Sequence, residues 1–286
     1  MTISKRVLAT AVLASFWACS PTDKKEEAST EDTIATFSYD FTKSDEKYEM
    51  PKVLKEISGI SFYADGQLVC VQDEDGEVFV YDLNQKKVTA QHQFGPPDDY
   101  EGIEKVEDEI YVMRSDGKLL SFKFGDKETR EIETSLPGKN DLEGLTYDKV
   151  NKRLWLAVKD PSKKAAKGDD KLIYSFDLKS RRIFTELELK EQQFENAGLK
   201  GKDWKEFKPS GVAFHPQTGE VYLISSAGHR LIIMSRSGVP LQNIELDKEL
   251  LKQPEGIAFS PDGTLYIASE GGNGNGYILK FSPTSK

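Results

Sequence analysis

The stretch "PEGIAFSPDGTLYIASE", residues 254–270, places two apolar runs on either side of Asp262-Gly263. An Asp-Gly pair between apolar runs is a strong signal for a β-hairpin, because both residues tolerate the backbone angles of a tight turn. Near the start of the chain, Asp65-Gly66 separates "GISFY" from "QLVCVQ" in the same way. Each stretch predicts a hairpin whose first strand begins directly after a glycine.

That glycine recurs five times with the same apolar sequel. Its positions are Gly59, Gly102, Gly144, Gly211 and Gly256, which are separated by 43, 42, 67 and 45 residues. A repeat in the low forties is typical of a propeller blade of four strands. In the first copy we expect strands at 60–63, 68–72, 78–81 and 88–94. The sequence therefore predicts an all-β fold, a five-bladed β-propeller of four-stranded antiparallel blades.

The spacing also predicts how the ring closes. The longest separation exceeds a standard blade by roughly 24 residues, fewer than the ~40 that a sixth blade needs. The last copy has room for only three strands after its glycine. The segment Ile34–Phe41, "IATFSYDF", has alternating apolar residues. We expect it to supply the missing outer strand, so that no edge stays open. The propeller then spans residues 34–286.

The first residues indicate export. Lys5 and Arg6 precede an apolar run over residues 7–18. This run is shorter than the ~20 residues of a membrane span and is typical of a secretory signal peptide, at 1–18.

Cys19 follows this run directly. "FWAC", residues 16–19, resembles a bacterial lipobox, whose cysteine is acylated; Ala18 fits that pattern, whereas Phe16 and Trp17 depart from it. We expect Cys19 to be lipidated, the alternatives being a plain signal peptide or a buried cysteine. Residues 19–33 contain no large apolar side chain and predict a disordered tether.

The net charge of the chain bears on which partners it can bind. The net charge of -9 gives no basic footprint, so nucleic acid is not expected as a partner, and we expect a monomer. The second cysteine, Cys70, lies in an apolar strand pattern and predicts a buried, inert thiol.

Five stretches together resemble the SdiA-regulated family of bacterial envelope proteins, which is distantly similar to NHL-type propellers. They are "LKEISGISFY", "DYEGIE", "NDLEGLTYD", "KPSGVAFHPQTGEVYLISS" and "QPEGIAFSPDGTLYIASEG". The resemblance covers residues 34–281 and implies a five-bladed propeller with a bound calcium ion. It implies no activity, because the biochemistry of that family is unassigned. The atypical lipobox also resembles those of Bacteroidetes, so we expect the outer membrane sooner than the inner one.

Propeller geometry sorts the polar residues onto faces. The first strand of each blade lines the channel, and the residue before it lies at the channel mouth. These residues are Ser58, Glu101, Glu143, Ser210 and Glu255. The second strands end at the same mouth, at Asp73, Arg114, Lys159, Ser225 and Glu270.

Three unusual loops open on this face. Two are insertions that start at Lys159 and Glu191, and the third is glycine-rich and starts at Ser269. Long loops in compact domains are often functional. We therefore predict a ligand rim that includes Asp73, Arg114, Lys159, Trp204 and Glu270, with Phe207 as a further contact. The alternative is that the insertions are merely tolerated at the surface.

The three mouth glutamates predict a metal site. Carboxylates that converge raise one another's pKa unless a cation compensates, and rings of oxygen ligands suit Ca²⁺, which takes about 6–8 of them. Ser58 and Ser210 add neutral oxygens, and acids recur two positions before the ring, at Glu56, Asp99 and Asp141. The alternative is that the glutamates cap backbone amides or pair with Arg114 and Lys159 across the mouth. The family resemblance favours calcium.

Function remains open at this level. We expect a membrane-anchored envelope lipoprotein, held through its lipid anchor only, whose channel mouth binds an unassigned ligand or envelope protein. One alternative is a calcium-dependent hydrolase of a phosphoester, ester or lactone at the same site; another is a scaffold with a structural metal. His229 alone among the histidines is expected near the mouth, as a loop residue, and the chain has no Gly-x-Ser-x-Gly elbow or zinc-type cluster. Whether the protein is an enzyme is not decided by these residues.

Overall fold

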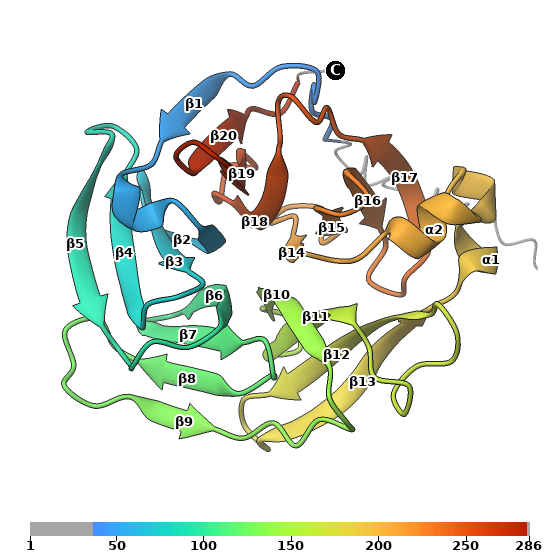
Figure 1. Cartoon of the computed structure of the whole chain (residues 1–286), viewed down its shortest axis with the longest axis horizontal. Helices are drawn as coiled ribbons and strands as arrows, with labels where there is room; N and C mark the ends of the chain where they lie inside the picture. The colour runs from blue at the N-terminus through green and yellow to red at the C-terminus, as the bar shows by residue number, and fades with distance from the viewer. Residues whose placement is uncertain (1–36, 285–286) are drawn as a thin grey trace, which may run out of the picture. The chain divides into compact units, whose positions relative to one another are not determined.

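The computed structural model describes residues 37–284, and within them twenty strands form five antiparallel sheets of four (Figure 1). The sheets stand around a common centre as the blades of a five-bladed β-propeller, which confirms the predicted fold. Blades 1 and 2 comprise β2 (Ile57–Ala64), β3 (Gln67–Gln72), β4 (Glu77–Asp82), β5 (Lys87–Gln93), β6 (Tyr100–Val106), β7 (Glu109–Arg114), β8 (Leu119–Phe122) and β9 (Arg130–Ile132). Blades 3 and 4 comprise β10 (Asp141–Asp148), β11 (Arg153–Asp160), β12 (Lys171–Asp177), β13 (Arg182–Leu189), β14 (Gly211–Phe214), β15 (Val221–Ser225), β16 (Arg230–Met234) and β17 (Pro240–Glu245).

Blade 5 confirms closure by an N-terminal strand but corrects which one. It comprises β18 (Gln253–Phe259), β19 (Leu265–Glu270), β20 (Tyr277–Phe281) and, outermost, β1 (Glu46–Glu49). β1 pairs with β20 from Glu46 opposite Lys280 to Glu49 opposite Tyr277. The prediction that Ile34–Phe41 forms this strand is wrong, since residues 37–41 form no strand.

The aromatic alternation of that segment has another cause. The ring of Phe41 packs on Phe281 with centroids 5.3 Å apart. The hydroxyl of Tyr39 donates to the carbonyl oxygen of Gly263 at 2.6 Å and lies 2.9 Å from Nε2 of His215. The segment is therefore held by side-chain packing against blades 4 and 5 and not by strand pairing.

The repeated glycines allow the first strands to approach one another. A Cβ atom at Gly211 would lie 2.3 Å from the carbonyl oxygen of Glu255, and one at Gly102 would lie 2.7 Å from Cβ of Leu145. None of the five repeated glycines has a positive φ. Close approach of neighbouring strands around the channel, and not turn geometry, requires glycine at these positions.

The two insertions lie where the sequence predicted, but one part of that prediction is corrected. The second insertion folds as α1 (Glu191–Phe194), η2 (Glu195–Ala197) and α2 (Lys202–Glu206); a further short helix, η1 (Lys52–Leu54), precedes β2. Trp204 and Phe207 are each only 1% exposed and pack with Phe194 against blades 3 and 4. They anchor the insertion and do not contribute to a ligand rim.

The predictions for the two cysteines and for the N-terminal segments differ in whether the described residues include them. Cys70 is fully buried and unpaired in the described part of the chain, and burial raises the pKa of its thiol, as expected. The signal peptide, Cys19 and the tether lie outside the described residues. Between residues 37 and 284, no helix is both long and apolar enough to cross a bilayer.

Candidate functional site

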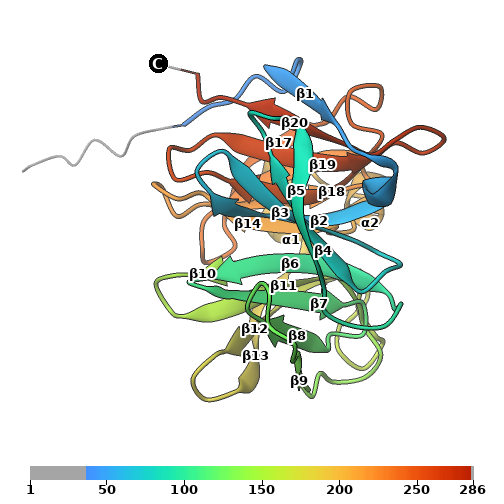
Figure 2. The same ribbon diagram turned by 90° about the vertical axis from the view of Figure 1, so that its left-hand side faces the viewer.

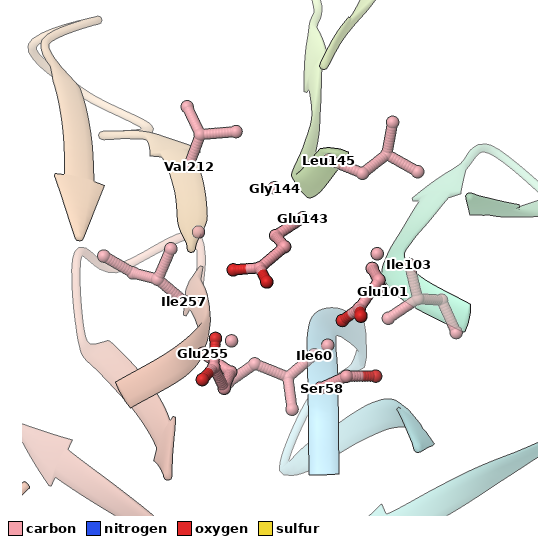
Figure 3. Close-up of a pocket in the computed structure, with 14 residues that line it drawn as sticks. Ser58, Ile60, Glu101, Ile103, Glu143, Gly144, Leu145, Val212, Glu255 and Ile257 are labelled. Carbon is pink, nitrogen blue, oxygen red and sulfur yellow. The ribbon is translucent and has the colours of Figure 1, made fainter. Parts of the chain in front are cut away.

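A β-bulge at the start of the first strand determines the direction of each glutamate side chain at the channel mouth. In four blades, strand pairing skips the residue before the glycine, so that Ser58, Glu101, Glu143 and Glu255 have no partner in the second strand. A bulge re-aims the side chain of the extra residue. The three glutamate carboxylates consequently point toward one shared space (Figure 3). The fourth blade differs, because β14 starts at the glycine itself.

This space is a small hollow at the channel mouth, with about 10 Å³ of room for the centre of a water molecule. Deeper in the channel, every blade contributes the residue after its glycine, and these five side chains are at most 5% exposed: Ile60, Ile103, Leu145, Val212 and Ile257 (Figure 3). A drug-sized molecule needs far more room than this, whereas one water molecule needs roughly 10–15 Å³ on the same measure. The hollow therefore suits an ion with water better than an organic ligand. Sequence reasoning missed this apolar plug, although each copy of the repeat shows an Ile, Leu or Val there.

Burial and crowding shift the titration of the glutamates. Burial, with the charges of Glu143, Asp99 and Glu255, raises the pKa of Glu101 to about 10. Burial also raises the pKa of Glu255, and the charge of Glu143 adds to that shift. For Glu143 the effect of burial exceeds that of a neighbouring lysine, and its pKa rises to about 7. These shifts are those of carboxylates with too little positive charge nearby.

Among residues 37–284, one lysine forms an ion pair with a glutamate of this set. The ammonium group of Lys159, at the end of β11, binds Oε1 of Glu143. Burial lowers the pKa of Lys159, but the hydrogen bond and charge of Glu143 outweigh it, so that the net shift is upward. Oε2 of Glu143 is buried and has no hydrogen-bond partner among residues 37–284. The side chain of Glu143 is 5% exposed, so this orphan oxygen is an acceptor available to a ligand.

The alternative pairing is correct for Lys159 but wrong for Arg114. Arg114 instead binds Asp98 at 2.7 Å and Asp116 at 2.8 Å. Lys159 thus faces a net excess of negative charge at the mouth.

The two mouth serines have a structural role. The Ser58 hydroxyl donates to the carbonyl oxygen of Tyr100 at 2.7 Å, and the Ser210 hydroxyl donates to that of Pro254 at 2.6 Å. Each bond ties the start of one first strand to that of the next blade.

The outer acids surround the hollow without entering it. Glu56 pairs with Lys55 at 2.8 Å, Asp99 accepts a hydrogen bond from Ser115, and Glu270 accepts one from Gln253 at 3.1 Å. Asp141 is half-buried, and burial raises its pKa.

Asp73 is the outer acid with an unsatisfied oxygen. Burial and the charges of Glu56 and Glu74 raise its pKa to about 6, and Oδ1 has no hydrogen-bond partner in the described part of the chain. Over residues 37–284, no three His, Cys, Asp or Glu side chains already lie at the spacing of metal ligands.

The ring of four-stranded blades with an acidic, blind channel mouth defines the class: a five-bladed propeller with an oxygen-rich axial site. The profile of the SdiA-regulated family matches residues 32–273, so the chain belongs to the SdiA-regulated family. No curated protein matches the sequence.

Solved structures show similarity at low identity. The luciferin-regenerating enzyme is 15% identical, with 82% of this chain and 92% of that chain covered and a TM-score of 0.52. Streptogramin B lyase is 14% identical, covering 87% and 98%, with a TM-score of 0.49. Glutaminyl cyclase of Myxococcus xanthus is 12% identical, covering 84% and 95%, with a TM-score of 0.49. The first similarity supports the propeller fold and nothing about activity.

Proposed function

We propose that this protein is a lipid-anchored envelope lipoprotein whose propeller binds one Ca²⁺ at the channel mouth and uses that face as a binding module. The observation that carries the proposal is the set of three inward carboxylates from three blades, of which only Glu143 pairs with a cation among residues 37–284. Calcium takes oxygen ligands in flexible geometry, and the donors here are all oxygens.

The residues fit such an ion in chemistry. Glu143 offers the unpartnered Oε2, and Glu101 and Glu255 have raised pKa values that a nearby cation would lower. Because the carboxylates are not yet at ligand spacing, we expect binding to draw them together. Bound calcium would supply positive charge at the mouth, and the apolar plug would keep water from entering behind it.

The anchor is supported by the sequence alone. A chain with a signal peptide and an acylated Cys19 would be held at a membrane surface, outer in preference to inner. Fatty-acid labelling of wild type and Cys19→Ala tests this part: equal labelling would contradict it.

Calorimetric titration of metal-stripped protein tests the calcium site. A hundredfold excess of calcium over Kd stabilises a folded protein by about 2.7 kcal/mol, or roughly 5 °C in melting temperature for a chain of this size. Glu143→Gln should abolish most of the heat and of the thermal shift. Glu133→Gln is the matched control, because that side chain is 74% exposed on an outer edge. No heat and an unchanged melting temperature at millimolar calcium would overturn the proposal.

A second candidate is a calcium-dependent hydrolase at the same site. The observation that favours it is the position of Glu143, whose Oε2 has no hydrogen-bond partner among residues 37–284 and which lies beside Lys159 at the mouth, since a general base must lie within hydrogen-bond reach of the proton that it removes. Phosphoester, ester and lactone substrates, each assayed with and without chelator, distinguish the two. Chelator-sensitive turnover that Glu143→Gln abolishes would establish the enzyme. Calcium binding without turnover would leave the binding module.

A further inference from the structure

The end of the propeller opposite the mouth, here termed the turn face, carries the connections from first to second and from third to fourth strands. The chain enters the propeller at this face, because Tyr39 is bound to His215 and to Gly263 in two of these turns. The amide of Thr284 donates to the carbonyl oxygen of Ser38 at 2.8 Å. Both ends of the described chain thus lie at the turn face, whereas α2 lies at the other end (Figure 2).

Two apolar side chains project from turns of this face. Val150, between β10 and β11, is 77% exposed, and Val239, before β17, is 55% exposed. Their turns are joined, because the guanidinium of Arg236 pairs with Asp148. The other large hydrophobic side chains exposed in the described part of the chain are Val53, near the mouth, and Leu241, on an outer strand. Exposed apolar side chains gathered on one face indicate a contact surface.

The same turns are basic. Lys149 and Lys152 flank Val150, and Lys179 and Arg181 occupy the other turn of blade 3 on this face. None of these four forms an ion pair with another residue between 37 and 284. The mouth has the opposite character, with carboxylates in excess. A valine between two free lysines suits a surface that is negatively charged outside and apolar beneath, as a lipid bilayer is.

We infer that the turn face of blades 3 and 4 contacts the surface of an anionic lipid bilayer, a second contact beyond the lipid anchor. This inference rests on the anchored lipoprotein of the proposed function. Residues 20–36 reach at most about 60 Å when fully extended, which is enough for the propeller to turn over, so the anchor alone does not fix its orientation. Lys149, Lys152 and Arg181 meet the headgroups, Val150 and Val239 enter the interface, and the channel mouth faces away from the membrane.

Vesicle flotation of an unanchored chain that begins at Ser20 tests the inference. This chain retains every described strand, and the absence of the acyl group separates the test from that of Cys19. We expect binding to vesicles of phosphatidylethanolamine with phosphatidylglycerol and little binding to phosphatidylcholine alone. Lys149→Gln with Lys152→Gln should weaken binding roughly 30-fold, since each basic side chain contributes about a factor of five.

The valines provide a matched pair. Val150→Asp with Val239→Asp should weaken binding at least tenfold, whereas Val53→Asp should leave it unchanged, because Val53 is 54% exposed at the opposite end. Unchanged melting temperatures confirm that the variants fold. No flotation with phosphatidylglycerol, or equal loss in Val53→Asp, would overturn the inference whatever the labelling of Cys19 shows. Failure of that labelling alone would overturn the anchor and leave the measured affinity intact.

Discussion

Strand β10 carries a buried carboxylate near each end, and the two differ in their hydrogen-bond partners and in the direction of their pKa shifts. Asp148, at the turn face, is fully buried and pairs with Arg236, and it also accepts the amides of Val150 at 2.9 Å and Asn151 at 3.2 Å. Burial raises its pKa, but these bonds outweigh burial and the net shift is downward. Glu143, at the mouth, has one lysine and an orphan oxygen, and its pKa is raised.

This difference separates stability from function within one strand. Both cations are about equally exposed, at 33% for Arg236 and 36% for Lys159. Beyond its cation, Asp148 is bound by the side chain and the backbone amide of Asn151, whereas the charges of Asp141 and Asp160 raise the pKa of Glu143 further. A fold that satisfies Asp148 with local amides leaves Glu143 short of donors, which is expected where an external ligand completes the site.

The largest effect should come from the glycines that bring the first strands together. Gly211→Ala places a methyl group 2.3 Å from a backbone oxygen, so the strand must shift, and we expect a loss of about 3 kcal/mol or more in the free energy of unfolding. Gly274→Ala, which meets its nearest atom at 3.6 Å, should be nearly neutral. Chemical denaturation of both variants measures this. Equal stability of the two would refute close approach as the reason for the repeat.

Removal of each cation tests the comparison itself. Lys159→Met leaves Glu143 without a partner, and we expect a loss of about 2 kcal/mol at pH 8, below the 3–5 kcal/mol of a fully buried pair. Calcium should restore that loss. Arg236→Met should also destabilise, because Arg236 lies over the ring of Phe214 at 4.5 Å, but calcium should not restore it. Melting curves with chelator and with calcium decide, and equal rescue of both variants would contradict a site at the mouth.

The repeat could be predicted from the sequence because its cause is local. Every blade needs a glycine where a neighbouring strand approaches closely, followed by a branched apolar residue. The same two-residue pattern therefore recurs in each copy of the repeat. The closing strand β1, "EKYE", has only a weak sequence pattern, because Tyr48 is its single buried residue. The clearer alternation at 37–41 arises from aromatic packing on the turn face.

The site shows the same limit. The position before each glycine predicted which residues reach the mouth, because the register of the first strand is repeated. The bonds from the hydroxyls of Ser58 and Ser210 to carbonyls depend on the neighbouring blades. Which cation binds Glu143 depends on how side chains are placed within blade 3. The prediction that Trp204 contacts a ligand is wrong, because loop length indicates where an insertion lies but not which of its side chains anchor it.

A smaller effect separates the two faces by pH. Glu101 and Glu143 have folded pKa values of about 10 and 7, above the ordinary 4.5. Between the ordinary pKa of 4.5 and these folded values, the folded, metal-free protein binds more protons than the unfolded chain. Its free energy of unfolding therefore falls as pH rises from about 4.5 to 10. Glu101→Gln should flatten this fall above pH 7, and calcium should oppose it. Melting temperatures in chelator across pH 5–9 provide the test; a flat profile for wild type would contradict the crowding of these acids.

The turn face should respond to pH in the opposite direction and more weakly. Burial lowers the pKa of His215 from 6.5 to about 4, while its Nδ1 accepts the amides of Gln217 at 3.3 Å and Thr218 at 3.2 Å. The unfolded chain binds a proton that the folded one excludes, so stability is present above pH 6.5 and is lost as pH falls toward 4.

His215→Gln should remove this acid-dependent loss. Tyr39→Phe is the matched control, because it loses the hydroxyl bonds to His215 and Gly263 without losing a titratable imidazole. We expect Tyr39→Phe to destabilise by about 1 kcal/mol at every pH and to retain the acid slope. Hydrogen exchange of the Thr284 amide reports on this end locally. The amide is bound to the carbonyl oxygen of Ser38, so it exchanges faster when the segment around Ser38 is released. If His215→Gln kept the acid slope, the histidine would not be the group that fastens this end of the chain, and the contrast between the two faces would rest on the mouth alone.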